Sequence, residues 1–534
     1  MLKNIKKVTI VGGGSAGWMS ACMFIKTFPH WDIQIIESPD YPIVGVGEST
    51  LLGIREFLHY LDISLEEQKD MMRYTDASYK MSIKFTDFYD KDSGGYHYPF
   101  GEPYVEESKE GLQDWMIRKS LDDSIPVQDF VKTYYPSAAL FENNKYCDNK
   151  YGILPGYEPH RHCAYHFDAT KLGQWLKNNY CLPRGVELIS NTVEDILTND
   201  DGIEALILKT GEKVVSDLYV DCTGFKSLLL DKTLQSEFTS FTDLLPNNRA
   251  WAVHLPYKDK EKELEGFTNS TAIGHGWCWN IPLWSRIGTG YVYSDKHITP
   301  QDAKEEFKEY LMSDKVVIPR SREDVENLNF KDIQMRVGMH KQSFYKNVVA
   351  IGLSAGFIEP LESNGLLSVH IFLFKLMKTL LRESVNQFEK DSYNKETYWF
   401  FKNFAEFVAL HYAFSIRNDT NYWRDITSKT FDETMYDNIK YDTISFSDIS
   451  HKKHYTSVLD PKAGVTYVSI GMNYLVMDKV TMKTNEFWTL DTYKNDYQNS
   501  FIRMDINKKN WQTFAIEQPS LYKYLKDNIH VNGD

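Results

Sequence analysis

The segment EPLESNG, residues 359–365, places carboxylates just before an expected helix over 366–381. Pro360 suits the first turn of a helix, and acidic side chains near a helix N-terminus complement its dipole, so a structural role explains this composition. The alternative is functional: free N–H groups near Asn364 and Gly365 form an anion site, while Glu362 points elsewhere. The sequence alone leaves both interpretations open.

Lys80 is a second candidate for chemistry, in the segment SYKMSIKF over residues 78–85. Strict alternation predicts a β-strand with Lys80 and Lys84 on its polar face. We expect solvated lysines on a half-exposed strand. A lysine opposed by a carboxylate could instead hold or polarise an electrophilic oxidant, and the spacing does not distinguish the two.

A glycine-rich turn near the N-terminus predicts a dinucleotide-binding unit. The expected order is a buried strand, a GGGSAG turn and a helix, at residues 8–11, 12–17 and 18–26. Gly12 permits the tight turn, Gly14 lets a pyrophosphate approach the backbone, and Gly17 lets helix and strand pack closely. A second strand, 32–36, ends in Glu37, where a carboxylate would accept hydrogen bonds from ribose hydroxyls.

Three further glycine turns favour FAD over NAD. They are the loop GVGEST and the strand ends DLYVDCTG and VVAIG, at residues 45–50, 217–224 and 348–352. Turns so far apart in the chain suit a long, folded-back ligand, which predicts an α/β, Rossmann-like FAD-binding fold of the monooxygenase type. The expected cofactor contacts are Gly12, Gly14, Ser15, Ala16, Gly17, Glu37, Gly47, Glu48, Ser49, Gly352 and Leu353.

The segment GWCWNIP over residues 276–282 predicts a strand with Trp277, Trp279 and Ile281 on one side. Tryptophans at positions i and i+2 are typical of packing in a core or against a cofactor. The spacing does not separate these two uses.

Composition and charge exclude several classes of protein. With 534 residues the chain is too long for one hydrophobic core, so we expect two or three interleaved sub-cores. Its 60 basic and 74 acidic residues give a formal charge of −14, which argues against nucleic-acid or anionic-membrane binding. No uninterrupted apolar window of ~18 residues predicts a membrane span. The six cysteines show no CxxC or zinc spacing, so we expect reduced thiols, no metal and a cytoplasmic location.

Taken together, these segments resemble the flavin-dependent halogenases of the tryptophan halogenase family. The resemblance rests on motifs between residues 12 and 424: GGGSAG at 12–17, GVGEST at 45–50, SYK at 78–80, YHFDATKLG at 165–173, DCTGF at 221–225, WCWNIP at 277–282, GLSAGFIEPLESNG at 352–365 and HYAFSIRNDTNYWR at 411–424. WCWNIP fits the family's WxWxIP pattern in full and is the most diagnostic of them.

The resemblance implies a two-component enzyme with a separate NAD(P)H-dependent flavin reductase. Its FADH2 and dioxygen give a flavin C4a-hydroperoxide, and halide held near Asn364 and Gly365 is oxidised to hypohalous acid. The oxidant reaches Lys80, which binds it by hydrogen bond or as a haloamine, and Glu362 orients the electrophile or stabilises and deprotonates the arenium intermediate. The residues implied to keep flavin and substrate apart are Trp277 and Trp279.

Two departures from the family pattern concern the substrates. Asn364 stands where the family commonly has Thr, which leaves the preference among chloride, bromide and iodide open. The stretch 443–477 shows no match to the clamp that holds free tryptophan in specific members, so we equally expect a simpler indole or another electron-rich ring. Candidate substrate-pocket residues are His97, Phe100 and Ser363.

We expect an FAD-binding module from residues 1–85 and 160–365, and a mainly helical substrate-binding cap from 86–159 and 366–534. The expected partners are the reductase and a small aromatic substrate, without nucleic acid or membrane, and homo-oligomerisation is left open. Two alternative functions are weighed: an FAD-dependent aromatic monooxygenase, which hydroxylates, and a non-catalytic flavoprotein.

Overall fold

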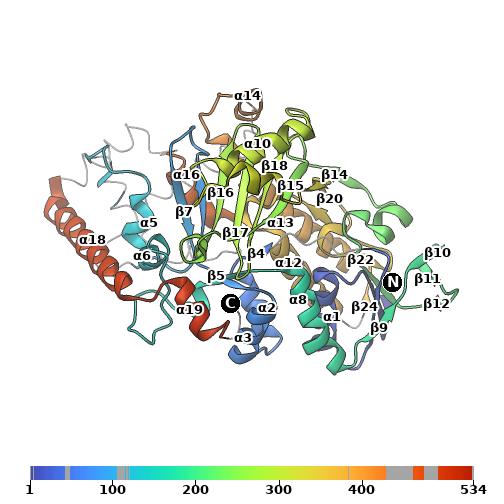
Figure 1. Cartoon of the computed structure of the whole chain (residues 1–534). Helices are drawn as coiled ribbons and strands as arrows, with labels where there is room; N and C mark the ends of the chain where they lie inside the picture. The colour runs from blue at the N-terminus through green and yellow to red at the C-terminus, as the bar shows by residue number, and fades with distance from the viewer. Residues whose placement is uncertain are drawn as a thin grey trace. The chain divides into compact units, whose positions relative to one another are not determined.

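The computed structural model describes residues 2–3, 5–41, 48–104, 115, 118–119, 121–382, 384–428, 461–473 and 491–531 (Figure 1). Unit 1 comprises Met1–Ala77, His166–Ala252 and Lys331–Ala405, and unit 2 comprises Ser78–Tyr165, Val253–Phe330 and Glu406–Asp534. Residues 253–330 thus join the same compact unit as 86–159, and residues 366–405 join unit 1. The expected cofactor and substrate modules are defined by ligands rather than by compactness, so that division stays a prediction.

A six-stranded sheet forms the centre of unit 1. Its order is β21 (Phe344–Tyr345), β22 (Val348–Ala350), β13 (Leu218–Asp221), β2 (Lys7–Val11), β3 (Asp32–Glu37) and β9 (Glu187–Ser190). All neighbours pair in parallel except β21 with β22. Val8, Ile10 and Ile35 are fully buried, as β-branched residues are in a parallel sheet that is covered on both faces.

Helices of unit 1 pack around this sheet. They are α1 (Ser15–Thr27), α2 (Gly53–Tyr60), α3 (Leu65–Tyr74), α8 (Ala169–Trp175), the π-helix η1 (Leu176–Cys181) and α12 (Gly365–Leu380). Helix α1 contacts α8, η1 and α12, and Figure 1 shows α1 and α8 side by side. The expected helices over 18–26 and 366–381 are therefore confirmed, each beginning slightly earlier than predicted.

Shorter elements complete unit 1 and its borders. They are β1 (Leu2–Lys3) with β24 (Ser384–Val385); β4 (Glu48–Ser49) with β8 (Ala164–Phe167); β10 (Val193–Asn199), β11 (Gly202–Leu208) and β12 (Lys213–Val214); β14 (Phe238–Ser240), β20 (Gly338–His340) and β23 (Gly356–Phe357); β15 (Arg249–Leu255) with β19 (Lys331–Gln334); and the short helices η2 (Leu182–Arg184), η3 (Gly224–Lys226), η4 (Leu228–Thr233), η5 (Gly352–Ser354) and η6 (Pro360–Glu362). The long helix α13 (Gln387–Ala413) begins in unit 1 and ends in unit 2.

Unit 2 is organised around neighbouring strands of a mixed sheet. Their order is β18 (Ile287–Tyr293), β17 (Gly276–Pro282), β16 (Phe267–Ile273), β6 (Ser82–Thr86) and β7 (Gly95–Pro99). The segment before β6 forms the separate strand β5 (Ser78–Lys80). Only β16 and β6 pair in parallel among these five strands.

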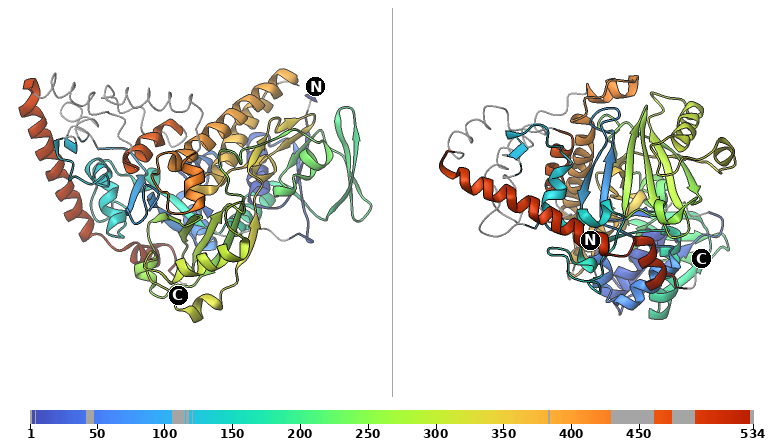
Figure 2. Two further views of the ribbon diagram at one scale, coloured as in Figure 1. Left: turned by 90° about the horizontal axis from the view of Figure 1, so that it is seen from above. Right: turned by 60° about the vertical axis from the view of Figure 1, so that its left-hand side comes forward.

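The helices of unit 2 are α5 (Asp129–Tyr134), α6 (Pro136–Glu142), α7 (Pro159–His162), α9 (Lys260–Glu263), α10 (Pro300–Met312), α11 (Arg322–Glu326), α14 (Asn421–Thr427), α16 (Pro461–Gly471), α18 (Asp491–Glu517) and α19 (Leu521–Asn528). Helix α18, the long red helix in Figure 2, contacts α5 and α6. Within the described ranges, no helix has both the length and the apolarity needed to cross a bilayer.

Asp221 ends β13 and organises the turn that follows it. Its buried carboxylate accepts hydrogen bonds from the N–H groups of Thr223, Leu229 and Leu230 at 3.0, 2.8 and 2.9 Å, and from the Thr223 hydroxyl at 2.7 Å. A buried charge is tolerated when it is hydrogen-bonded in this way. The aspartate of the DCTG segment therefore supports the fold.

We predict that Asp221→Asn lowers the free energy of unfolding by about 2–4 kcal/mol, because an amide N–H2 would then face backbone N–H donors in a buried site. Asp217→Asn is the matched control, since Asp217 accepts two backbone N–H groups at the exposed N-terminal side of the same strand. Its expected loss is below about 1 kcal/mol. Thermal unfolding of the two variants measures the difference, and equal shifts would contradict the role of Asp221.

Candidate functional site

The turn between β2 and α1 distinguishes glycines that the fold needs from a glycine that leaves space. A Cβ at Gly12 would lie 2.3 Å from the Cys222 carbonyl oxygen, and one at Gly17 would lie 1.9 Å from the Gly12 carbonyl oxygen. A Cβ at Gly14 would meet no atom within 4 Å. Gly14 is also the N-cap of α1 without a side-chain cap. Open space at uncapped N–H groups fits the pyrophosphate of a dinucleotide.

Other residues predicted to contact the cofactor connect this turn to neighbouring elements. Ser15 Oγ donates a hydrogen bond to the Ala169 carbonyl at 2.8 Å, which joins α1 to α8. A Cβ at Gly352, where φ is +72°, would lie 3.0 Å from the Ala16 Cβ. Leu353, beside it, is more than one-third exposed. The turn after β22 therefore reaches α1, as the glycine pattern predicts for one folded-back ligand.

Glu37 lies at the end of β3, the position predicted for a ribose acceptor. Its carboxylate is 2.8 Å from Lys177 Nζ and remains partly exposed. A Cβ at Gly13 would lie 2.3 Å from Glu37 Cγ, so Gly13 allows this side chain to lie along the turn. The geometry fits the ribose, and contact with it stays a prediction.

The start of α12 brings the GEST and ESNG segments together. Ser49 Oγ and Ser363 Oγ are 2.9 Å apart, and a Glu48 carboxylate oxygen lies 3.7 Å from the Cβ position of Gly365. Asn364 is the N-cap without a side-chain cap, and its buried Oδ1 has no hydrogen-bond partner among the described residues. An uncapped helix start with free N–H groups suits an anion. Gly47, the other candidate of this loop, lies outside the described residues.

Two carboxyl groups of these segments lie inside unit 1. Burial, with a smaller contribution from the charge of Asp168, raises the pKa of Glu48 to about 7. Glu362 is 1% exposed and ends η6, so Pro360 begins a separate short helix rather than α12. Ser363 then adopts φ +59° and redirects the chain into α12.

Lys80 is fully buried, so the prediction of a solvated lysine is wrong at this position. The strand breaks at Met81, whose N–H donates to the Gly266 carbonyl at 2.8 Å, and the chain continues as β6 between β16 and β7. Alternation in the sequence cannot reveal that both faces are covered. Nζ of Lys80 lies 5.1 Å from the centre of the Phe100 ring.

His97, the other candidate from this loop, is engaged in packing. Its Nδ1 is 2.9 Å from Ser82 Oγ, its ring stacks on Phe141 at 4.5 Å, and it meets Phe267 edge-on at 4.9 Å. Burial and nearby lysines lower the pKa of His97 well below its usual range. The structure brings Phe100, but not His97, into a described contact with Lys80, and a substrate role for either residue stays a prediction.

Trp277 and Trp279 lie two positions apart in β17 and therefore on the same face of the strand. Their ring centres are 6.2 Å apart. Asn280, on the opposite face, donates to the Tyr310 hydroxyl of α10 at 3.0 Å. The two buried tryptophans therefore face away from α10. This arrangement is compatible with a wall, and their separating role stays a prediction.

The matching block at 411–424 holds the turn that precedes these tryptophans. Arg417 Nη2 and Trp423 Nε1 donate to the Ile273 carbonyl at 3.2 and 2.8 Å, and the Thr420 hydroxyl donates to the Gly274 carbonyl at 2.6 Å. The Arg417 guanidinium also lies 4.2 Å from the Trp423 ring. Sequence reasoning gave these residues no role, because no local pattern relates them to a turn about 145 positions earlier.

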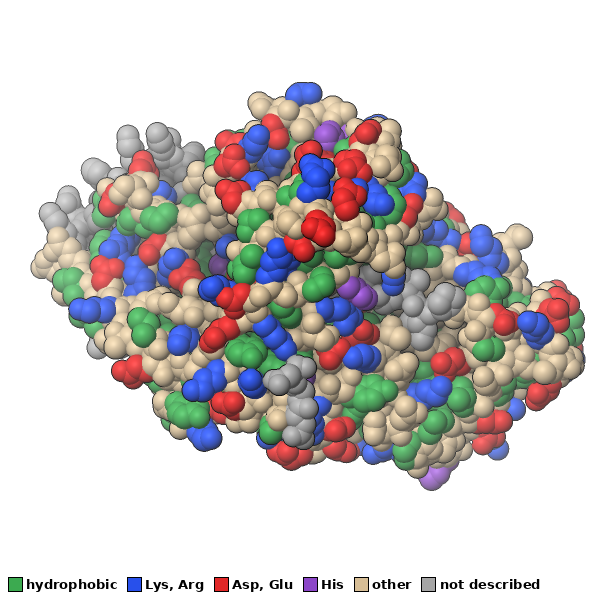
Figure 3. All heavy atoms as spheres, viewed as in Figure 1, with side chains coloured by type: hydrophobic (Ala, Val, Ile, Leu, Met, Phe, Trp, Pro, Cys, Tyr) green, Lys and Arg blue, Asp and Glu red, His purple; other side chains and the backbone are tan. Residues whose placement is uncertain are grey.

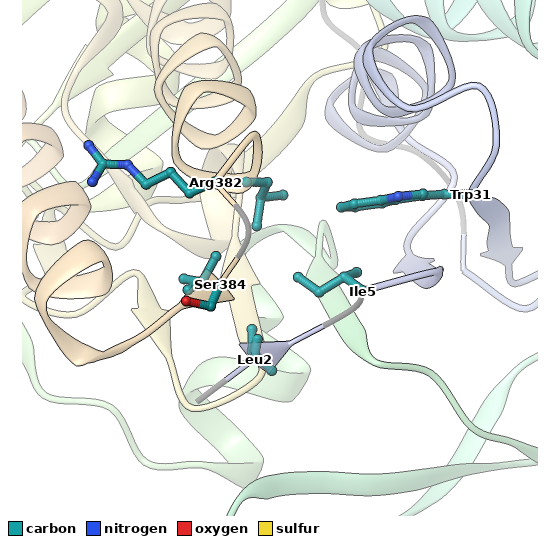
Figure 4. Close-up of a pocket in the computed structure, with 7 residues that line it drawn as sticks. Leu2, Ile5, Trp31, Arg382 and Ser384 are labelled. Carbon is teal, nitrogen blue, oxygen red and sulfur yellow. The ribbon is translucent and has the colours of Figure 1, made fainter.

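One described cavity of about 110 Å³ lies elsewhere in unit 1, between the N-terminal segment and the end of α12. Figure 4 shows that the Arg382 side chain extends away from Trp31. None of the candidate site residues lines it. Over the face in Figure 3, acidic and basic side chains are interspersed.

Comparisons with known proteins show the family of this chain. The family model for tryptophan halogenase matches residues 7–493. Tryptophan 6-halogenase SttH from Streptomyces toxytricini is 32% identical over 479 residues, which cover 86% of this chain and 88% of that protein. Tryptophan 7-halogenase RebH from Lentzea aerocolonigenes is 32% identical over 439 residues, which cover 79% of each chain.

The solved apo structure of VirX1 is similar over 99% of this chain and 100% of its own, with a TM-score of 0.86 and 33% identity. The resemblance identified from the motifs is thus confirmed, and the monooxygenase and non-catalytic alternatives are set aside. The chain belongs to the tryptophan halogenase family, as a flavin-dependent halogenase that uses FADH2 from a separate flavin reductase, a halide and an aromatic substrate.

Proposed function

We propose that this enzyme halogenates an indole or a tryptophan-like ring, with Lys80 holding the oxidant and Glu362 acting on the ring. The observation that carries the proposal is the complete burial of Lys80 beside Phe100, within a chain that belongs to the halogenase family. Fully buried lysines are rare, and ionisable groups enclosed in this way are concentrated at functional sites. The names of the two curated relatives support an indole-containing acceptor.

When bound, reduced flavin would reduce dioxygen to the peroxide level, and this oxidant would take two electrons from halide to give hypohalous acid and water. The residues proposed to hold FAD are those of the turn around Gly14 between β2 and α1, with Glu37 at the ribose. Gly352 and Leu353, in the turn after β22, complete this set. Asn364 and Gly365 hold the halide through N–H groups at the start of α12. Asn364 lacks the hydroxyl of the usual threonine, so the halide preference depends on these N–H groups.

Lys80 donates hydrogen bonds to hypohalous acid and polarises it toward the acceptor. Glu362 stabilises the positive charge that develops on the ring and accepts the proton that the ring loses. Trp277 and Trp279 keep the acceptor away from the flavin, and Ser363 lines the acceptor pocket beside Glu362. In the stretch 443–477, only residues 461–473 are described, so the predicted lack of a tryptophan clamp falls mostly outside the described residues.

We also propose a cytoplasmic location with an NAD(P)H-dependent reductase as a transient partner. All six cysteines are buried and none is in a disulfide, as in a protein that folds under reducing conditions. The reductase must meet the enzyme, or release FADH2 near it, because the reduced flavin reacts with dioxygen.

Gly14→Ala is expected to weaken FAD binding by about tenfold or more, because its methyl group would occupy the space proposed for the pyrophosphate. Its melting temperature should match that of wild type, since the methyl group meets no protein atom within 4 Å. Gly17→Ala is the matched comparison: its Cβ would clash with the Gly12 carbonyl, so both stability and FAD binding should fall. Fluorescence titration and thermal unfolding measure the two effects, and unchanged FAD affinity in Gly14→Ala would contradict the proposed cradle.

Lys80→Ala is expected to abolish ring halogenation while hypohalous acid still forms and escapes. Product is followed by mass spectrometry, and escaped oxidant by a soluble 1,3-diketone trap. Lys84→Ala is the control, because Lys84 lies on β6, half-buried, with its amine 5.8 Å from the Phe267 ring. Normal halogenation by Lys80→Ala would remove Lys80 from the mechanism.

Glu362→Gln is expected to slow ring halogenation by about 10²–10⁴-fold without loss of FAD binding, because the amide neither carries charge nor accepts the ring proton. Glu359→Gln controls for a change within the same segment: Glu359 accepts a hydrogen bond from Asn247 at 2.8 Å, which the glutamine oxygen can still accept. Single-turnover rates with a fixed amount of FADH2 separate the two variants. Equal rates for Glu362→Gln and wild type would exclude the proposed role.

A further inference from the structure

Phe100 occupies the position where a ring meets the buried amine of Lys80. Nζ lies 5.1 Å from the ring centre, and both side chains are buried. The backbone N–H of Phe100 donates to the Met81 carbonyl at 2.9 Å. This backbone hydrogen bond therefore holds residue 100 next to Met81, the residue that follows Lys80.

The neighbouring positions carry phenol rings. Tyr96 and Tyr98 lie two positions apart in β7. The Tyr98 ring stacks on the Tyr467 ring, with ring centres 5.0 Å apart. Tyr79 precedes Lys80 in β5 and points to the other face of the strand, where it stacks on Tyr146 at 4.5 Å. This part of unit 2 thus accommodates tyrosines readily, yet the ring beside Nζ lacks a hydroxyl group.

We propose that the Phe100 ring beside Lys80 is chemically inert toward the oxidant. A phenylalanine at this position prevents the enzyme from halogenating its own side chain at residue 100. The inference rests on the proposed function, because it requires an electrophilic halogen at Nζ. A phenol is activated toward electrophilic substitution by its oxygen, whereas a phenylalanine ring reacts far more slowly. A tyrosine at position 100 would be an acceptor held permanently beside the oxidant, and its effective concentration would exceed that of any diffusing substrate.

The side reaction that Phe100 prevents uses the enzyme's own oxidant. Hypohalous acid loses its O–X bond, and a C–X bond forms at the ring carbon ortho to the phenol oxygen. The proton displaced from that carbon joins the released hydroxide as water. Each event would consume one oxidant and leave one halogen on the protein.

The test measures halogen on the protein itself. Phe100→Tyr is supplied with FAD, NADH, a flavin reductase, bromide and an excess of the diketone trap, without an aromatic acceptor. We expect one bromine in place of hydrogen at residue 100, located by peptide mass spectrometry. Phe100→Leu and wild type should carry none there. Adding Lys80→Ala to Phe100→Tyr should abolish the label, because the trap then removes the escaped oxidant.

A folded Phe100→Tyr enzyme that oxidises bromide and keeps residue 100 unmodified would overturn the inference. A label that persists after Lys80→Ala would overturn it as well, since free oxidant would then be responsible. If tyrosine disturbs folding at this buried position, Phe100→Met provides the same test: its thioether gains oxygen from hypohalous acid and halide is released. Its sulfoxide should form only when Lys80 is present. Acceptor halogenation by the single variant Lys80→Ala tests the proposed function separately.

Discussion

The close approach of main chain at the first βα turn is the constraint on which the rest of unit 1 depends. The carbonyls of Gly12 and Cys222 occupy the space where side chains at positions 17 and 12 would stand. These contacts join β2, β13 and α1 without any side chain between them. Between these two tightly packed glycines, a Cβ at Gly14 would meet no atom within 4 Å. The same sequence motif therefore combines two close backbone contacts with one position that has open space beside it.

A corresponding constraint in unit 2 lies at the turn between β16 and β17. Arg417, Thr420 and Trp423 hold its carbonyl groups, so the strand that carries Trp277 and Trp279 starts from a fixed point. The arginine is itself 3% exposed and paired with Asp419 at 2.9 Å. A buried guanidinium in such a network is costly to disturb, which gives the HYAFSIRNDTNYWR block a physical role in positioning the proposed wall.

Local patterns predicted the elements that depend on local physics. The β-branched run of β2, the glycine turn, α1 and the alternating segment of β17 all follow from neighbours in the chain. The burial of Lys80 could not be predicted in this way, because alternation in the sequence does not reveal that all three residues of β5 are buried in the folded chain. Likewise, the acceptor role of Asp221 depends on a turn that only the folded chain defines. For the site, the motifs identified the glycines and the α12 start, whereas the Lys80–Phe100 contact required the structure.

The residues proposed to bind the cofactor and those proposed for the halogenation step differ in how far they are buried. The turn from Gly12 to Ala16, Glu37 and Leu353, which are proposed to hold FAD, are partly exposed. Lys80, Phe100 and Glu362 are almost completely buried. Hypohalous acid reacts with many side chains and is diluted once it reaches solvent, so selectivity depends on keeping it enclosed. Under the proposed mechanism, enclosure would make the neighbours of Lys80 into reactants unless they are inert, so the identity of residue 100 would bear on the chemistry as well as on packing.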